Sequence, residues 1–436
     1  MPGEEQKSGR PSLLKNDIVV DQFSLRDAMR IMKPVFPVSS VLACAVTALL
    51  AMETASSKEL EITAGTRAIS QGVLFTEKPA DLPADPVLQG PNGETIPLQE
   101  DAANRLSFIL PALPAGQSVR FKLAQGTPAK EPAALTKIDG NTLCFSVSGK
   151  PVGSYQADTK DLKTPRPGLD PKFIRGGYLH PLITPSGKTV TDDYPANHLH
   201  HHGVWMAWTK AVYDGRETDF WNMGQGKGRV DFSALDKFWS GPVHAGLVAK
   251  NRYTDLTSGS PVVVLNEQWT VRIYAVANGE KPYHLIDLET EQNLAGNLPL
   301  GLPQYHYGGL GVRGPTNWDG ATNASFLNSE GLTDRLKLNA QPARWMRMTG
   351  TVDGSAAGVA VLSHPDNFRS PQPVRVHPKE PFISFAPQTN GDMEIKPGET
   401  YRTRYRFVIS DGDADAALLD ELWQAFAEPP VVKWVD

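Results

Sequence analysis

Glycine and proline residues punctuate this chain along its whole length, and between them lie short segments in which apolar and polar residues alternate. The 436 residues include 38 Gly and 36 Pro, which are spread along the chain and not clustered. Alternation with a period of two places successive side chains on opposite faces of a strand. The runs Glu267 to Tyr274 and His284 to Thr290 follow this pattern. Since no strand–helix–strand alternation is visible, the chain is predicted to fold as an all-β, antiparallel β-sandwich or supersandwich.

Turn-rich stretches divide the chain into four predicted parts. The first boundary candidate after the N-terminus is the patch GTPAKEPAA at residues 126–134. One helix is expected near the C-terminus, from Asp413 to Ala427, because an Asp starts it and apolar residues follow at helical spacing. The predicted parts are an N-terminal extension with signal peptide (1–57), a small β-sandwich module (58–135), the main β-supersandwich (136–412) and the C-terminal helix and tail (413–436).

The N-terminal part contains the one membrane-like segment of the sequence, Val35 to Met52. Arg30 and Lys33 precede it and small residues follow it, which is typical of a secretory signal peptide. We therefore expect an over-extended start, with Met29 or Met32 as the true first residue, and a periplasmic or secreted protein without a stable transmembrane span after cleavage. A lipoprotein is the alternative at Cys44, although largely apolar residues follow that cysteine.

Charge and cysteine content narrow the possible partners. The formal net charge is −5, and no block of Lys and Arg is present that could follow a phosphate backbone, so a nucleic-acid partner is not expected. Removal of the signal peptide would leave a single cysteine, Cys144, which rules out an intramolecular disulfide.

The strongest chemical signal is the segment Phe173 to Trp208, which contains five of the ten histidines. Pro195 and Gly203 bracket the run NHLHHHG and disfavour a helix. In an extended conformation, alternate histidines would share one face of the segment. Two or three imidazoles with a neighbouring carboxylate could bind a divalent metal, and one imidazole could instead act as a general acid or base. The residues concerned are His180, His198, His200, His201, His202, Asp192 and Asp193.

Two further patches carry candidate binding groups. The run QYHYGGLGVRGPTNW at residues 304–318 combines aromatic rings with a cation, an amide and glycines that permit close backbone approach. Such a set suits a sugar ring, or else a glycine-rich bulge that packs its own aromatics; no Lys-Ser/Thr follows to make a phosphate loop. The Pro-rich stretch Ser363 to Gln388, with His364, Asp366, Asn367, Arg369 and His377, could close over a pocket or form a rigid surface crossing.

Three motifs resemble a bacterial family usually labelled PmoA or methane oxygenase, whose central domain has no established function. They are RGGYLHPLITPSGKTVTDDYPANHLHHHGVWMAW, YGGLGVRGPTNW and SHPDNFRSPQPVRV, in matching order over roughly Asn141 to Ser410. The resemblance implies a galactose-mutarotase type of supersandwich, a fold associated with carbohydrate-active enzymes. It also implies functional roles for His180, Asp193, His198, His200, His201, His306 and Arg313. The family usually has Arg at the position of His202, which speaks against a ligand role there.

These observations predict an exported carbohydrate-active enzyme, an epimerase, lyase or hydrolase, that uses histidine and carboxylate acid–base chemistry. The alternatives are a non-catalytic glycan-binding protein and a metal-dependent redox enzyme, as the family label suggests. The substrate is expected to be a carbohydrate or another small molecule, and a divalent metal is the possible cofactor. Catalytic candidates are His201, His306, His180, Glu267 and Glu289; substrate-binding candidates are Arg313, Tyr305, Tyr307, Trp205 and Asn317; metal-ligand candidates are His198, His200 and Asp193.

The signal-peptide interpretation predicts the N-terminus of the exported protein. Cleavage should fall among the small residues Thr54, Ala55 and Ser56, because signal peptidases cut after such residues. N-terminal sequencing of the mature protein measures this directly. A mature product that retains Leu14 to Ile31 would contradict the interpretation.

Overall fold

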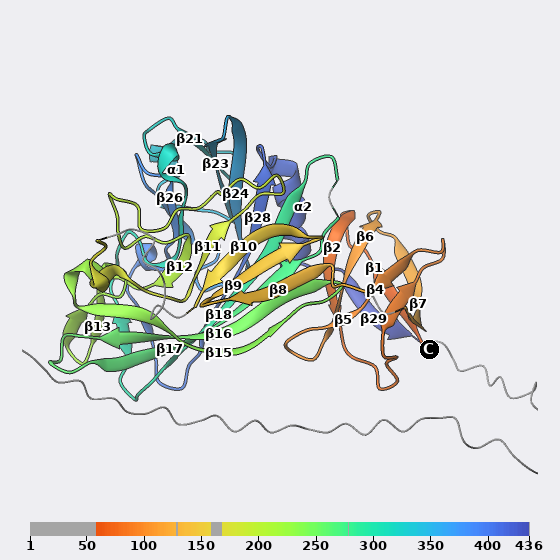
Figure 1. Cartoon of the computed structure of the whole chain (residues 1–436), viewed down its shortest axis with the longest axis horizontal. Helices are drawn as coiled ribbons and strands as arrows, with labels where there is room; N and C mark the ends of the chain where they lie inside the picture. Colours follow the sequence, from red (N-terminus) through yellow and green to blue (C-terminus); the bar gives the residue numbers. More distant parts are fainter. Residues whose placement is uncertain (1–57, 128–129, 158–167, 278, 436) are drawn as a thin grey trace, which may run out of the picture. The chain divides into compact units, whose positions relative to one another are not determined.

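Two large antiparallel β-sheets form the body of the computed structural model, which describes residues 58–127, 130–157, 168–277 and 279–435 (Figure 1). The predicted N-terminal extension and signal peptide, residues 1–57, lie outside the described residues. Every strand pairing that the structure describes is antiparallel, so the prediction of an all-β antiparallel fold is confirmed. No helix among the described residues is both long and apolar enough to cross a membrane.

The first large sheet has eight strands, and the long alternating runs noted in the sequence are at its centre. In spatial order they are β15 (Gly228–Trp239), β16 (His244–Asp255), β17 (Val262–Tyr274), β18 (Tyr283–Leu294), β28 (Tyr401–Asp411), β24 (Ser355–Ser363), β23 (Trp345–Val352) and β21 (Ala324–Asn328). The second sheet has nine: β22 (Gln341–Pro342), β25 (Pro373–Val376), β26 (Phe382–Phe385), β20 (Gly309–Arg313), β12 (Val204–Ala207), β11 (Tyr178–Leu182), β10 (Lys150–Gln156), β9 (Thr142–Val147) and β8 (Ala134–Asp139).

The main hydrophobic core lies between these two sheets. Leu247 and Ile286 of the eight-stranded sheet and Met206 and Leu310 of the nine-stranded sheet belong to one buried cluster. Because side chains alternate along a strand, the neighbour of Met206, Trp205, points to the other face of its sheet. There it joins a second, aromatic-rich cluster. The sandwich therefore buries one face of the nine-stranded sheet and leaves the other face to build the site described below.

Three smaller sheets complete the described chain. A four-stranded sheet contains β14 (Arg216–Thr218), β13 (Ala211–Tyr213), β19 (Leu300–Leu302) and β27 (Met393–Ile395). A five-stranded sheet contains β29 (Val431–Val435), β1 (Glu59–Thr63), β7 (Ser118–Gln125), β3 (Pro86–Gln89) and β4 (Thr95–Pro97), so the two ends of the described chain pair with each other. A three-stranded sheet contains β2 (Ile69–Thr76), β6 (Leu106–Leu113) and β5 (Gln99–Glu100).

The predicted C-terminal helix is confirmed as α2 (Ala416–Ala427), with Asp415 accepting a hydrogen bond from the amide of Leu418 at its start. A one-turn helix that the sequence pattern did not predict, α1 (Arg335–Leu338), is capped in the same way by Asp334. The described 3₁₀ turns are η1 (Pro171–Phe173), η2 (Met223–Gln225), η3 (Thr316–Trp318) and η4 (Pro387–Asn390).

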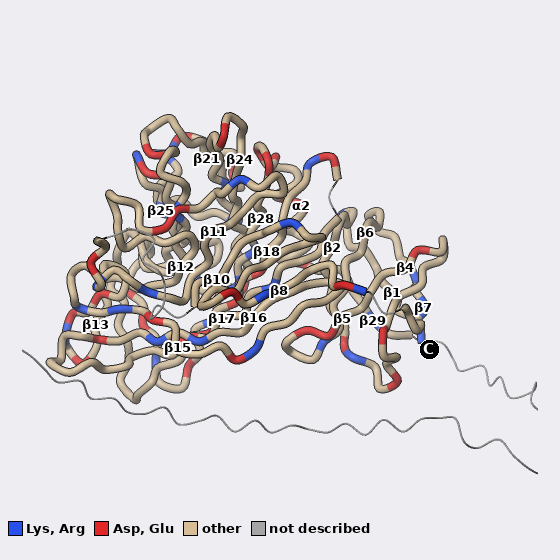
Figure 2. Tube along the Cα trace, in the orientation of Figure 1, with Lys and Arg blue, Asp and Glu red and all other residues tan. Residues whose placement is uncertain are grey.

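Charges of both signs are interspersed along the eight-stranded sheet (Figure 2). One pair is buried: Nε and Nη2 of Arg406 on β28 lie 2.7 and 2.9 Å from the two carboxylate oxygens of Asp287 on β18. Tyr274 on β17 adds a third hydrogen bond to that carboxylate. In contrast, Arg402 pairs with Glu291 on the same two strands at the exposed end of the sheet.

The buried and the exposed ion pair predict different effects on the free energy of unfolding. Asp287→Ala should lower the free energy of unfolding by about 3–5 kcal/mol, because it leaves a buried guanidinium without its counter-charge. Glu291→Ala, the control, should change it by less than about 1 kcal/mol, since that pair is exposed. Urea-induced unfolding followed by circular dichroism measures both. Equal losses in the two variants would contradict the interpretation.

Candidate functional site

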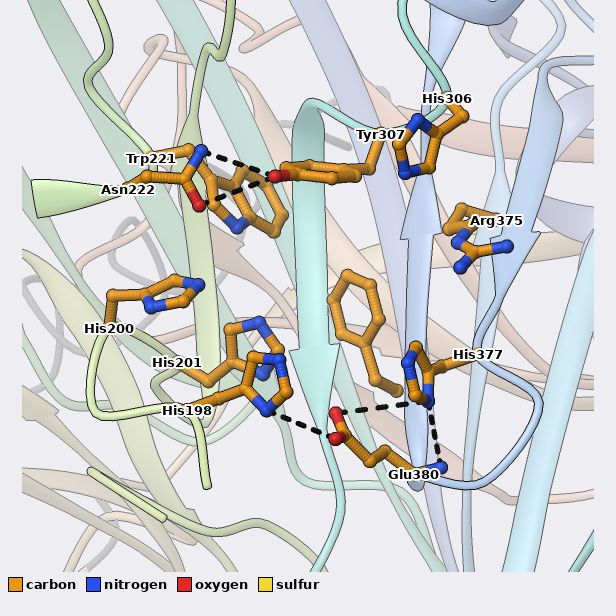
Figure 3. Close-up of a pocket in the computed structure, with 11 residues that line it drawn as sticks. His198, His200, His201, Trp221, Asn222, His306, Tyr307, Arg375, His377 and Glu380 are labelled. Carbon is orange, nitrogen blue, oxygen red and sulfur yellow. Dashed lines mark hydrogen bonds and ion pairs between the residues drawn. The ribbon is translucent and has the colours of Figure 1, made fainter. Parts of the chain in front are cut away.

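A cavity of about 180 Å³ lies beside the histidine segment, which contributes three of its lining residues, and the other lining residues come from farther along the chain (Figure 3). Its walls combine imidazole rings, aromatic rings, one carboxylate and one guanidinium. The lining residues are His198, His200, His201, Trp221, Asn222, His306, Tyr307, Arg375, His377, Glu380 and Phe382.

The histidine loop between β11 and β12 is folded into two successive turns. The amide of His198 donates to the carbonyl of Pro195 at 2.9 Å, and the amide of His201 donates to the carbonyl of His198 at 2.8 Å. The expectation of an extended segment with alternate histidines on one face was therefore wrong. The turns bring the imidazoles of His198 and His201 into a stacked arrangement with ring centroids 4.6 Å apart, and His200 lies 4.7 Å from His201.

Glu380 is the carboxylate of the cavity, and a buried arginine holds it in place. Arg313, at the end of β20, has no exposed surface and donates from Nη1 to Oε2 of Glu380 at 3.1 Å. Its Nη2 lies 2.7 Å from Oδ1 of Asp319. Burial alone would raise the pKa of Glu380, but the hydrogen bond with His198 and the charges around it, including Arg313, lower that pKa overall. Glu380 is thus an ionised carboxylate at neutral pH.

Three groups in the cavity have the donor atoms and the proximity that a metal ion requires. Nδ1 of His198 lies 3.0 Å from Oε1 of Glu380. One ligand atom each from His198, His201 and Glu380 lie within 4.8 Å of one another. In addition, Nδ1 of His201 is buried and has no hydrogen-bond partner among the described residues. An imidazole nitrogen left in that state is costly unless something else binds it.

Two histidines of the cavity, His200 and His201, are neutral at physiological pH. Burial lowers the pKa of His200 to about 3, and the neighbouring His198 contributes in the same direction. Burial also lowers the pKa of His201 well below its usual value, with further contributions from His200, His198 and Arg313. A neutral imidazole offers a lone pair, which is the form that binds a metal or accepts a proton.

The opposite wall of the cavity is aromatic and hydrogen-bonding. Tyr307 packs against Trp221 with ring centroids 5.3 Å apart, and its hydroxyl exchanges hydrogen bonds with the side-chain amide of Asn222. His306 and Arg375 complete this wall (Figure 3). The cavity therefore presents ring faces and polar groups to the same small volume, an arrangement typical of sites for small polar molecules.

The structure brings together five of the predicted site residues at the cavity and places three others directly behind it. The five are His198, His200, His201, His306 and Tyr307. Arg313 stands behind Glu380, where it binds this carboxylate instead of a ligand. Trp205 packs behind His201 at 5.1 Å between ring centroids, and Tyr305 packs against His306 at 4.3 Å.

The remaining predicted residues are committed elsewhere. His180 contacts the hydroxyl of Thr191, and Asn317 donates to the carbonyl of Thr351. Glu267 is buried, with hydrogen bonds from Asn251, Tyr253 and Gln292. Glu289 lies near Arg272 in a separate cavity. Asp193 accepts hydrogen bonds from the hydroxyl of Tyr178 at 2.7 Å and contacts Nδ1 of His202 at 2.8 Å, so the structure does not bring it into the metal-binding group.

The sequence reasoning missed Glu380, Arg375, Trp221, Asn222 and Phe382. It did name His377, in the stretch that it expected either to close over a pocket or to form a surface crossing. A signal for Glu380 was present, since His377 and Glu380 flank a Pro-Lys dipeptide: the amide of Glu380 donates to Nδ1 of His377 at 3.0 Å across this turn. The other candidates of that stretch lie outside the cavity; Arg369, for example, binds backbone carbonyls of Pro387 and Gly391.

Comparison with known proteins places the chain in a family. The model of a family of unknown function, DUF6807, matches residues 142–424, which is more than half of the chain, so the chain belongs to this family. The family description carries no methane-oxygenase label. The matched range includes every residue that lines the cavity. No functionally curated protein matches the chain in sequence.

Two solved structures show a distant likeness. One is a galactose mutarotase related enzyme from Lactobacillus acidophilus, with 10% identity and a TM-score of 0.31, over 64% of this chain and 98% of that one. The other is a TPR-domain containing protein from Parabacteroides distasonis, with 10% identity and a TM-score of 0.21, over 80% of this chain and 57% of that one. Neither likeness is close enough to transfer a function.

The position of Asp193 predicts a structural role. Asp193→Ala should lower the free energy of unfolding by about 2–5 kcal/mol, because Tyr178 and His202 would each lose a buried hydrogen-bond partner. Chemical unfolding curves measure the loss. Asp236→Ala serves as the control, since Asp236 pairs with Lys250 on the surface, and it should cost less than about 1 kcal/mol. If Asp193→Ala were as mild as the control, the structural role would be wrong.

Proposed function

We propose that this chain is a metal-dependent enzyme that acts on a carbohydrate, or a closely related hydroxylated small molecule, in the histidine-lined cavity. The observation that carries the proposal is the convergence of His198, His201 and Glu380, whose ligand atoms lie within 4.8 Å of one another. Two imidazoles and one carboxylate form the protein ligand set of several catalytic zinc sites and of non-haem iron(II) sites.

The surroundings of this group support a catalytic ion over a structural one. Three protein ligands leave at least one coordination position for water or substrate, whereas structural zinc sites are closed by four. The group borders an open cavity, so that position is accessible. A divalent ion there would polarise a substrate oxygen or activate a bound water. Arg313, behind Glu380, keeps the carboxylate ionised and oriented.

The opposite wall supports a sugar-like substrate. Trp221, Tyr307 and Phe382 offer ring faces that can pack against the C–H face of a sugar, and Asn222 and His306 offer hydrogen bonds to its hydroxyls. Epimerisation, elimination and hydrolysis remain the proposed reaction classes, because each needs an activated oxygen or carbon acid next to a proton carrier. If the predicted signal peptide is cleaved, the enzyme works outside the cytoplasm.

A second candidate is the metal-free acid–base enzyme that the sequence predicts. The 3.0 Å contact between Nδ1 of His198 and Oε1 of Glu380 favours it, because a carboxylate that orients an imidazole and stabilises its cation is a common device of general acid–base catalysis. In this version Glu380 positions His198, which exchanges the proton with the substrate. Metal content distinguishes the two candidates.

The metal proposal predicts about one equivalent of a first-row divalent metal per chain in protein purified without chelators. His201→Ala and Glu380→Gln should each reduce this metal content at least tenfold, because two remaining ligands bind weakly. His306→Ala is the matched control, since His306 lines the same cavity outside the ligand group, and it should retain the metal. Inductively coupled plasma mass spectrometry measures the content.

Three results would contradict the proposal in different ways. Metal-free protein that converts a sugar, and loses this activity in His198→Ala, would establish the acid–base candidate. Protein that binds oligosaccharides without converting any of them, with or without metal, would be a glycan-binding protein. Copper or iron with oxygen-dependent turnover would instead favour the redox enzyme considered from the family label.

A further inference from the structure

Arg375 places a positive charge on the cavity wall, and no carboxylate among the described residues forms an ion pair with it. It lies on β25, is half-buried, and faces the cavity between His306 and His377, across from His200 (Figure 3). In the part of the chain that the structure describes, its guanidinium forms no ion pair, and its one hydrogen bond runs from Nη1 to Oδ1 of Asn339 at 2.9 Å. An arginine has five N–H donors, so several remain for a ligand.

Glu380 is the one carboxylate among the residues that line the cavity, and both of its oxygens already contact other residues. Its Oε2 accepts from Arg313 at 3.1 Å, and its Oε1 contacts His198 at 3.0 Å. Glu380 therefore attracts the charge of Arg375 only at longer range and forms no ion pair with it. The effect of Arg375 reaches the neighbouring rings: after burial, its charge is the next cause that lowers the pKa of His306.

Asn339 holds the guanidinium in a fixed position. Its Oδ1 accepts hydrogen bonds from Arg375 and also from the amide of Val376 at 3.3 Å. Asn339 directly follows α1, so a helix end and a strand together orient the side chain. A cation that is fixed before the ligand arrives loses less conformational freedom on binding, which strengthens recognition.

We propose that Arg375 binds the carboxylate of an anionic substrate, and that the cavity selects a sugar acid over the corresponding neutral sugar. A guanidinium matches the two oxygens of a carboxylate with parallel hydrogen bonds. A single arginine without a helix N-terminus or a second cation among the lining residues suits one carboxylate better than a phosphate dianion. The inference rests on the proposed function in that the cavity must bind a sugar-like molecule, but it does not require the metal.

The test compares sugars that differ only in their charged group. Titration calorimetry of the purified chain with galacturonate and galactose, and with glucuronate and glucose, should show at least about tenfold tighter binding of each acid, as expected for hydrogen bonds to a charged group. Arg375→Gln should remove this preference without changing the affinity for the neutral sugar by more than about threefold. Arg375→Lys should retain part of the preference, and Arg402→Gln, outside the cavity, should leave it unchanged.

The possible outcomes separate this inference from the proposed function. Equal affinity for acid and neutral sugar in the wild-type chain would overturn the role of Arg375 and leave a carbohydrate site in place. Tighter binding of galactose 1-phosphate than of galacturonate, lost in Arg375→Gln, would overturn the carboxylate assignment. If the wild-type chain bound none of these probes, both the inference and a sugar-like substrate would be contradicted. Unchanged thermal unfolding of Arg375→Gln would show that the variant is folded.

Discussion

A guanidinium without exposed surface must have its charge balanced inside the protein, and in this structure Arg313 imposes that requirement on the whole site. Its Nη groups reach Glu380 and Asp319, and Asn197 lies within 3.4 Å of it. These partners come from three separate segments of the chain. Asn197 lies in the first turn of the histidine loop, Asp319 directly follows the 3₁₀ turn η3, and Glu380 lies in the connection before β26. One buried cation at the end of β20 thus ties the histidine loop to the segment that carries Glu380, because two carboxylates balance its charge and Asn197 accepts a further hydrogen bond from it.

The need to balance a buried charge gives the two arginines of the site different roles. Arg313 is fully compensated and sets the position and ionisation of Glu380, so it shapes the site from behind without facing the cavity. Arg375 donates a hydrogen bond to the side-chain amide of Asn339 and pairs with no carboxylate among the described residues, so its charge is available to a molecule that enters the cavity. A divalent ion at His198, His201 and Glu380 would add positive charge on the other wall, which would strengthen attraction for an anionic substrate.

Much of the fold could be predicted from the sequence because alternation and turn residues are local signals. The runs at Glu267 to Tyr274 and His284 to Thr290 lie within β17 and β18, and the C-terminal helix lies where its spacing indicated. The order of strands in the sheets could not be predicted in this way, since β28 inserts between β18 and β24 through contacts made far along the chain.

For the site, composition located the histidine segment but not the geometry within it. Asp193 and Glu380 are both acidic residues close to histidines in sequence, and only the fold distinguishes their roles. Asp193 contacts Tyr178 and His202, whereas Glu380 contacts His198 from a distant segment of the chain. The extended conformation expected for the histidine loop was also wrong, because its backbone forms two turns.

The proposed metal site can be tested by anomalous X-ray diffraction from crystals of the purified chain, recorded above and below the absorption edge of the metal that the crystals contain. One anomalous peak is expected within about 2.0–2.3 Å of ligand atoms from His198, His201 and Glu380. No peak there, with Nδ1 of His198 still about 3 Å from Glu380, would contradict the metal site.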